Sequence, residues 1–128
     1  MEERRNFNTS KAPRMSQAFP QAVITEKFIF VSGTPGLDLN TGQVVSDSFE
    51  DQTRQCFHNI KVILEEGGSS MTNVVKTTIF LTDMALFTSV NEVYGKYFNG
   101  EFPARETVAV RGLPKNVNVE ISMIAVVS

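Results

Sequence analysis

The chain has 128 residues, of which 41% are hydrophobic and 20% charged, a composition typical of one globular domain. Its 12 basic and 14 acidic residues give a net charge of −2, so the sequence offers no broad basic surface for nucleic acid. A single cysteine excludes an intrachain disulfide, and no apolar run is long enough to span a membrane.

We interpret residues 1–128 as a single domain that begins with an arm over residues 1–18. The arm is polar, contains Pro13 and shows no periodicity, so we expect it to be poorly ordered unless other residues hold it. The first residues lack the apolar core of a signal peptide, and Glu2 and Glu3 argue against a transit peptide. These features predict a cytoplasmic protein.

The first regular elements are expected over residues 22–66. Residues 22–32 are rich in strand formers and predict a hairpin or a bent strand, ended by the glycines and proline of 33–36. A helix follows over about 48–66, with Ser48 as its N-cap and Gly67 and Gly68 after its end. Its apolar stripe consists of Phe49, Thr53, Cys56, Ile60, Ile63 and Leu64.

A strand over 71–81 and a second helix over about 84–98 come next. Valine, threonine, isoleucine and phenylalanine dominate the strand, and Asp83 is a suitable N-cap for the helix. The helix carries one stripe made of Phe87, Val90, Asn91, Tyr94, Tyr97 and Phe98. Asn91 is the one amide in this otherwise aromatic and aliphatic stripe.

The last part of the chain, 102–127, predicts a hairpin, two strands around a turn. Residues 106–110 alternate with period two, residues 117–127 are rich in β-branched side chains, and Gly112, Pro114 and Asn116 separate them. Strands and helices are interleaved, so we predict an α+β domain with two helices on one face of a mixed sheet. The other face would be apolar and uncovered, which predicts a closed homo-oligomer.

Two charges, Arg105 and Glu120, lie within these last strands and need solvent, a partner or a function. An arginine can grip a carboxylate with two parallel hydrogen bonds, and a glutamate can orient or deprotonate water. The alternative is a structural Arg105–Glu120 salt bridge or two exposed charges at a strand edge. Asn91 has an alternative too, as a buried amide bonded to backbone.

Other kinds of site find little support in the sequence. One histidine and one cysteine cannot form a structural zinc site, so we expect no metal and no cofactor. His58 falls opposite the apolar stripe of its helix and is expected at the surface, whereas Cys56 falls on the stripe and is expected in the core. The turn at Gly33 lacks the lysine and spacing of a phosphate-binding loop.

Several blocks together resemble the signature of the reactive intermediate deaminase (Rid, or YjgF) family. These blocks are FVSGTPGLD (30–38), QTRQCFHNIKVILEEGG (52–68), VVKTTIFLTD (74–83), VNEVYGKYF (90–98), PAR (103–105), LPK (113–115) and VEI (119–121). The resemblance implies a chorismate-mutase-like fold of the bacillary type. It also implies a homotrimer whose sheets form a central barrel, with sites between subunits.

The resemblance further implies an enzyme that hydrolyses enamines and imines, such as 2-aminoacrylate, to 2-keto acids and ammonia without a cofactor. Arg105 matches the arginine that grips the substrate carboxylate, and Glu120 matches the glutamate that positions water. Ser32, Gly33 and Asn91 match residues that shape the pocket.

Two positions of the substrate pocket differ from the family pattern. Phe19 stands where deaminase members usually carry tyrosine, and Thr107 stands where many carry cysteine. We therefore expect an altered pocket.

Two other functions are compatible with this reading. A trimer could bind small carboxylates without turnover, for example in regulation. An endoribonuclease or translation inhibitor, an activity sometimes attached to the family, is disfavoured because no basic, aromatic-rich face is evident.

Overall fold

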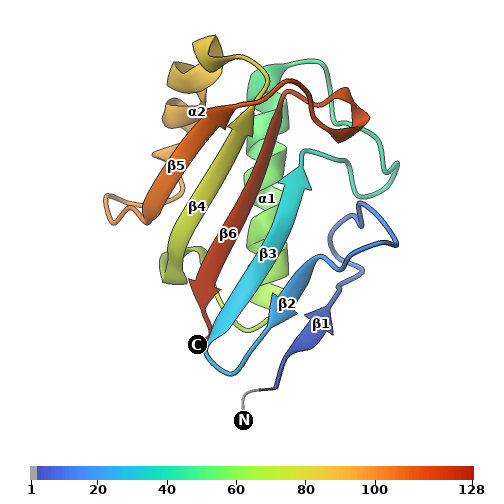
Figure 1. Cartoon of the computed structure of the whole chain (residues 1–128), viewed down its shortest axis with the longest axis vertical. Helices are drawn as coiled ribbons and strands as arrows, with labels where there is room; N and C mark the ends of the chain where they lie inside the picture. Colours follow the sequence, from blue (N-terminus) through green and yellow to red (C-terminus); the bar gives the residue numbers. More distant parts are fainter. Residues whose placement is uncertain (1–2) are drawn as a thin grey trace.

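The computed structural model describes residues 3–128 as an α+β domain with one six-stranded mixed sheet and two α-helices (Figure 1). The strand order is β1-β2-β3-β6-β4-β5, with β4 and β5 parallel and the other neighbours antiparallel. The strands are β1 (Arg5–Phe7), β2 (Ala22–Ile24), β3 (Phe28–Pro35), β4 (Val74–Leu81), β5 (Ala104–Ala109) and β6 (Val119–Val126). The helices are α1 (Phe49–Glu66) and α2 (Phe87–Tyr94), with short 3₁₀ turns at Met71–Asn73, Met84–Leu86 and Pro114–Asn116.

The sequence predicted either a hairpin or a bent strand over residues 22–32. The structure shows the hairpin, formed by β2 and β3. The second strand continues to Pro35, beyond the predicted stop at Gly33. An irregularity between Val31 and Thr34 shifts the register against β6, and pairing then resumes with Thr34 opposite Ile121 and Pro35 opposite Glu120. Such a bulge bends and twists the strand locally.

The N-terminal arm is held in place by an edge strand and a buried amide. Strand β1, which the sequence analysis did not predict, pairs with β2. The Gln21 side-chain nitrogen donates to the carbonyl oxygens of Thr9, Ala12 and Pro13, and its oxygen accepts from the Thr9 amide. The Gln21 side chain is almost fully buried, so these bonds satisfy an amide that would otherwise destabilise the fold.

The observed bounds of helix α1, Phe49–Glu66, confirm the helix predicted over about 48–66. The Ser48 side chain accepts from the amide of Asp51, and the helix ends before Gly67. The predicted stripe is buried apart from Phe49, which is half-buried, and Cys56 lies in the core as expected. The stripe omitted Phe57, which is fully buried and contacts three aromatic rings of the α2 region. His58 is exposed, as predicted.

Helix α2 is shorter than predicted. Asp83 caps a 3₁₀ turn instead of the α-helix, and the α-helix ends at Gly95, a poor helix former. The prediction of Asn91 in the buried stripe is wrong: α2 buries Val90, Val93 and Tyr94, and Asn91, rotated about 100° from Val90, is exposed.

The prediction that the last two strands form a hairpin is also wrong. Strand β4 lies between them, so that β5 and β6 each pair with β4. The segment β4–α2–β5 is a crossover unit that returns the chain parallel to β4. The chain then crosses the end of β4, where Val110 donates to Leu81 and Thr82 donates to Asn118, and β6 runs back on the other side.

Only one face of the sheet is covered by helices within residues 3–128. In Figure 1, α1 lies behind the sheet and α2 lies beside it near β5. On the opposite face Phe28, Phe30 and Val126 are 37%, 42% and 40% exposed. This uncovered apolar face, hereafter the open face, agrees with the prediction from the strand patterns. Among the same residues, no helix has the length and hydropathy needed to cross a bilayer.

Helix α1 and the end of β3 approach closely at Gly36. A Cβ atom on Gly36 would lie 2.4 Å from the carbonyl oxygen of Gln52, a backbone atom that cannot move aside. We expect Gly36→Ala to lower the free energy of unfolding by about 1–3 kcal/mol, the usual effect of overpacking. Urea denaturation measures this change. Gly112→Ala, where a Cβ meets open space, should change it by less than about 0.5 kcal/mol; equal effects of the two changes would contradict the prediction.

Candidate active site

A cavity of about 310 Å³ lies where the C-terminal end of α2 meets the start of β5. It is lined by Asn91, Tyr94, Gly95, Phe102, Pro103 and Arg105. Two residues predicted for the site, Arg105 and Asn91, therefore meet at one cavity. Neither Tyr94 nor Phe102 was predicted to belong to it.

The guanidinium of Arg105 is held against aromatic rings. Its Cζ atom lies 4.6 Å from the centre of the Tyr94 ring and 5.3 Å from that of Phe87, distances at which a cation is attracted to a ring face. Its Nε donates a 2.8 Å hydrogen bond to the hydroxyl of Thr107. Burial lowers the pKa of Arg105, but an arginine remains charged at neutral pH.

One donor group of Arg105 is left without a partner. The Nη2 atom is buried and makes no hydrogen bond with any residue of 3–128. A buried charged donor without an acceptor is costly, so this group favours an anion that enters the cavity. Carboxylates suit it best, because the planar guanidinium matches their two oxygens.

Glu120 belongs to a different set of residues. A Cβ atom on Gly33 would lie 2.6 Å from Glu120 Oε2, so the carboxylate occupies space that only a glycine leaves free. Burial raises the pKa of Glu120. A carboxyl with a raised pKa takes up a proton more readily at neutral pH than an ordinary one.

Hydrogen bonds hold the residues that follow Phe19 against Ser32, the residue before Gly33. The Ser32 hydroxyl donates to the carbonyl of Pro20 at 2.8 Å, and its amide donates to the carbonyl of Gln21 at 2.9 Å. These bonds fasten the end of the arm, including the neighbouring Phe19, to β3. Phe19 is 41% exposed. Phe19, Ser32, Gly33 and Glu120 thus form a second group of predicted site residues.

The two groups lie on opposite faces of the sheet. Arg105 pairs with Thr77 of β4, and Glu120 pairs with Phe80 of the same strand. Positions 77 and 80 are an odd number of residues apart, so their side chains, and those of their neighbours, point to opposite faces. Two strand spacings and three residues separate the two Cα atoms by more than about 10 Å.

The predicted alternative of an Arg105–Glu120 salt bridge is therefore wrong. No ion pair joins them among the described residues, whose ion pairs lie elsewhere. The other alternative, an Asn91 amide buried against backbone, is excluded by the exposure of Asn91.

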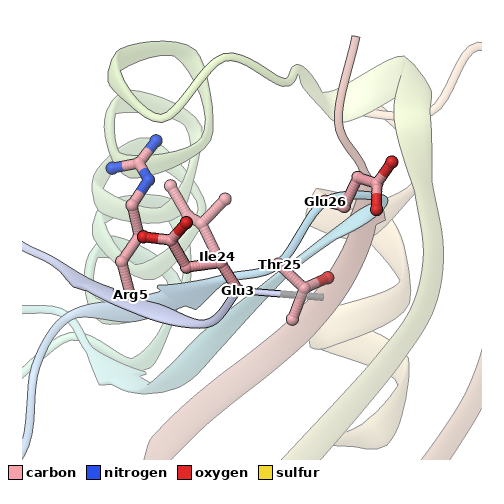
Figure 2. Close-up of a pocket in the computed structure, with 5 residues that line it drawn as sticks. All are labelled: Glu3, Arg5, Ile24, Thr25 and Glu26. Atoms are coloured by element: carbon pink, nitrogen blue, oxygen red, sulfur yellow. The ribbon is translucent and has the colours of Figure 1, made fainter. Parts of the chain in front are cut away.

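A second cavity, of about 390 Å³, lies at the β1–β2 edge (Figure 2). It is lined by Glu3, Arg5, Ile24, Thr25 and Glu26. Figure 2 shows the carboxylate of Glu26 well separated from the side chains of Glu3 and Arg5. None of the predicted site residues lines it, whereas Arg105 and Asn91 line the smaller cavity.

A family model and individual relatives point to the same protein family for this chain. The model of the family described as endoribonuclease L-PSP matches residues 9–127. The rat protein named 2-iminobutanoate/2-iminopropanoate deaminase is 43% identical over 96% of this chain and 90% of its own length. Reactive Intermediate Deaminase A of Arabidopsis thaliana, chloroplastic, is 46% identical over 92% of this chain and 63% of its own length.

Solved structures agree with these sequence relatives. The structure of Escherichia coli TdcF with bound serine superposes with a TM-score of 0.90 at 34% identity. The match covers 97% of this chain and 99% of TdcF.

The raised pKa of Glu120 predicts a pH-dependent effect on stability. Because the carboxyl binds its proton more tightly in the folded than in the unfolded chain, its ionisation lowers the free energy of unfolding as the pH rises through the two pKa values. Glu120→Gln cannot ionise, so at pH 7 we expect its Tm to exceed that of the wild type by a few °C at most, since the group is partly exposed. The difference should shrink towards about pH 4.

Calorimetry at the two pH values measures this difference. Glu65→Gln, which changes an exposed carboxylate on α1, is the matched control and should show a smaller pH dependence. A Tm of Glu120→Gln that falls below the wild-type value at pH 7 would contradict the expectation.

Proposed function

Because the chain belongs to the reactive intermediate deaminase family, we propose that it hydrolyses 2-imino acids at a site combining Arg105 of one subunit with Glu120 of another. It is an enzyme of the 2-iminobutanoate/2-iminopropanoate deaminase type, the name carried by relatives 41–43% identical over 96% of the chain. The observation that supports the site best is the buried, unpartnered Nη2 of Arg105 beside a small cavity.

Arg105 binds and orients the substrate carboxylate. The aromatic rings and the Thr107 hydroxyl already fix the guanidinium, so little side-chain freedom is lost on binding. A carboxylate bound to Nη2 satisfies this buried donor. Exposed Asn91 at the rim can donate or accept a further hydrogen bond.

Glu120 activates the water. Its carboxylate accepts a proton from water as the water oxygen bonds to the imine carbon, and this proton then passes to the imine nitrogen, which becomes an amine. The C–N bond of this adduct then breaks with transfer of a proton to the leaving nitrogen, which yields the 2-keto acid and ammonia. No electron is gained or lost overall. The raised pKa of Glu120 suits a group that must accept and return protons near neutral pH.

The site needs two chains because the two groups lie on opposite faces of one sheet. In a cyclic oligomer each subunit presents one surface to the preceding subunit and a different surface to the next, so the Arg105 group of one can meet the Glu120 group of its neighbour. The open face, with Phe28, Phe30 and Val126, is the surface that assembly would bury.

We infer a homotrimer of chorismate-mutase-like subunits, with the sheets around a central barrel and three equivalent sites. Phe19, Ser32 and Gly33 would form the wall of each site on the Glu120 side. A cytoplasmic location remains a prediction.

Loss of the guanidinium should abolish most of the activity. We expect Arg105→Ala to lower kcat/KM for a 2-imino acid by about 100-fold or more, since charge-assisted hydrogen bonds to the substrate carboxylate are removed. Arg105→Lys, which keeps the charge without the planar fork, should lose about 10-fold. The assay follows keto-acid release while a pyridoxal-phosphate dehydratase or an amino-acid oxidase generates the imine.

Arg54→Ala, which removes an exposed arginine of α1, is the control and should stay within about twofold of the wild type. Full activity of Arg105→Ala would refute the assignment. Keto-acid binding without any acceleration by the wild type would indicate the non-catalytic alternative, and RNA cleavage unaffected by Arg105→Ala would point to a contaminating nuclease.

Subunit mixing tests whether the site spans two chains. Arg105→Ala and Glu120→Gln homo-oligomers should each be nearly inactive. When the two are unfolded together and refolded at equal amounts, roughly a quarter of the interfaces should combine an intact Arg105 with an intact Glu120, and activity should recover to about that fraction. Light scattering of the wild type should give three chain masses. A monomer, or a mixture as inactive as its components, would rule out the shared site.

A further inference from the structure

We propose that the side-chain hydroxyls of Thr77 and Tyr94 form a buried pair that positions Arg105, and that this pair sets how tightly the site binds the substrate carboxylate. Both are positioning residues, because their buried hydroxyls act only through the guanidinium. The inference deepens the proposed function and rests on its assignment of Arg105 to the substrate carboxylate.

The buried polar atoms without partners gather at one place. Within residues 3–128 these side-chain atoms are Thr77 Oγ1, Tyr94 Oη and Arg105 Nη2. Thr77 of β4 stands directly opposite Arg105 of β5 in the parallel register, so the two side chains leave the same face of the sheet. Tyr94 approaches from α2, with its ring centre 4.6 Å from the guanidinium carbon. The three residues therefore form one cluster.

The two hydroxyls of this cluster lie near each other. Burial raises the pKa of Tyr94, and the Thr77 hydroxyl opposes this rise, as a donor close to the phenol oxygen does. Each hydroxyl can donate and accept, so a single hydrogen bond gives both a partner. Hydrogen bonds around a catalytic group are often poorly aligned before substrate binds, and we expect this one to align once the carboxylate is bound.

A second subunit cannot supply the missing partners. Thr77 is fully buried and Tyr94 almost fully buried within a single chain. Assembly covers further surface, but it does not bring another chain to atoms that already lie inside this one. The pairing of the two hydroxyls is therefore independent of how the subunits are arranged.

Packing alone does not explain either hydroxyl. The next buried residues of β4, Ile79 and Leu81, are aliphatic, and a valine would fill the same space as Thr77. The rings packed around Tyr94 are all phenylalanines: Phe57, Phe98 and Phe102. A buried hydroxyl lowers stability unless it has a partner, so two of them in an apolar setting indicate a pair.

The pair fixes the ring against which the guanidinium lies. Contacts with other rings leave Tyr94 some freedom to tilt, whereas a bond from its hydroxyl to Thr77 ties it to β4, the strand beside Arg105. A guanidinium that is already in place loses less freedom when it binds a carboxylate, so binding is tighter. The hydrolytic step depends on Glu120 on the opposite face, so the pair should act on substrate binding and leave kcat unchanged.

A double-mutant cycle tests the pair. Tyr94→Phe removes one hydroxyl and keeps the ring, and Thr77→Val replaces the other hydroxyl by a methyl group. We expect each change to raise the Kd for the keto acid 2-oxobutanoate, measured by calorimetry, by about three- to tenfold, the effect of one hydrogen bond. The KM for the imine should rise in step, with kcat within about twofold of the wild type. The double variant should bind about as tightly as either single variant, because only one bond is lost.

Tyr97→Phe is the matched control. It removes a hydroxyl from a ring that stacks on Phe57 in the same aromatic cluster, and its Kd should stay within about twofold of the wild type. Thr77→Ser, which keeps a hydroxyl at the proposed position, should recover most of the affinity lost in Thr77→Val.

Three outcomes would overturn the pair: single effects that add up in the double variant, a Kd of Tyr94→Phe within twofold of the wild type, or a fall in kcat as large as the rise in Kd. The last would indicate a general defect of the fold. A wild type that binds 2-oxobutanoate but accelerates no imine would overturn the deaminase alone, and the Kd values would still decide the pair. A wild type that does not bind 2-oxobutanoate would overturn this inference.

Discussion

The contact between the Arg105 guanidinium and the rings of Tyr94 and Phe87 is the constraint on which the candidate site depends. Placing a cation in a partly desolvated position is unfavourable, and the ring faces and the Thr107 hydroxyl offset only part of that loss. The part of this desolvation cost that is not offset falls on Nη2, which has no partner in the part of the chain that the structure describes. An incoming carboxylate therefore relieves an unfavourable state as well as forming new bonds. Helix α2 and strand β5 position the two sides of this contact, so the geometry of the candidate site depends on how the short α2 packs against β5.

Local patterns in the sequence predicted local structure well. Helix α1, its Ser48 cap and the burial of Cys56 follow from apolar spacing and capping chemistry, which act over a few residues. The pairing of strands was not predictable in the same way, because periodicity indicates which side chains are buried but not which strand lies alongside. The last two strands were therefore taken for a hairpin, although β4 separates them. The three-residue strand β1 carries too short a pattern to be detected.

For the site, too, the sequence predicted the residue types but not their arrangement in space. The residue types at Arg105 and Glu120 predicted a carboxylate grip and a water-positioning group, and the family resemblance assigned those roles. Spacing along the chain could not reveal that the two side chains leave opposite faces, because this follows only from the pairing of both strands with β4. Tyr94 was assigned to a packing stripe, which is correct, but its second role beneath the guanidinium depends on where β5 docks. The spacing predicts Asn91 in the buried stripe, but the helix buries Val90, Val93 and Tyr94, and Asn91 lies about 100° around the helix from Val90, in solvent.

The buried amide of Gln21 has a consequence for the edge of the sheet. An edge strand as short as β1 could slide along β2, and the polar side chains of Arg5 and Asn6 do little to distinguish one alignment from the next. A slip of one residue would carry the Thr9 backbone away from the Gln21 side chain and break the hydrogen bonds between them, including the one that the Gln21 oxygen accepts. Gln21 therefore makes misaligned pairings of β1 with β2 less stable than the native pairing. By keeping β1 in register, it also protects this exposed sheet edge against pairing with a strand of another chain.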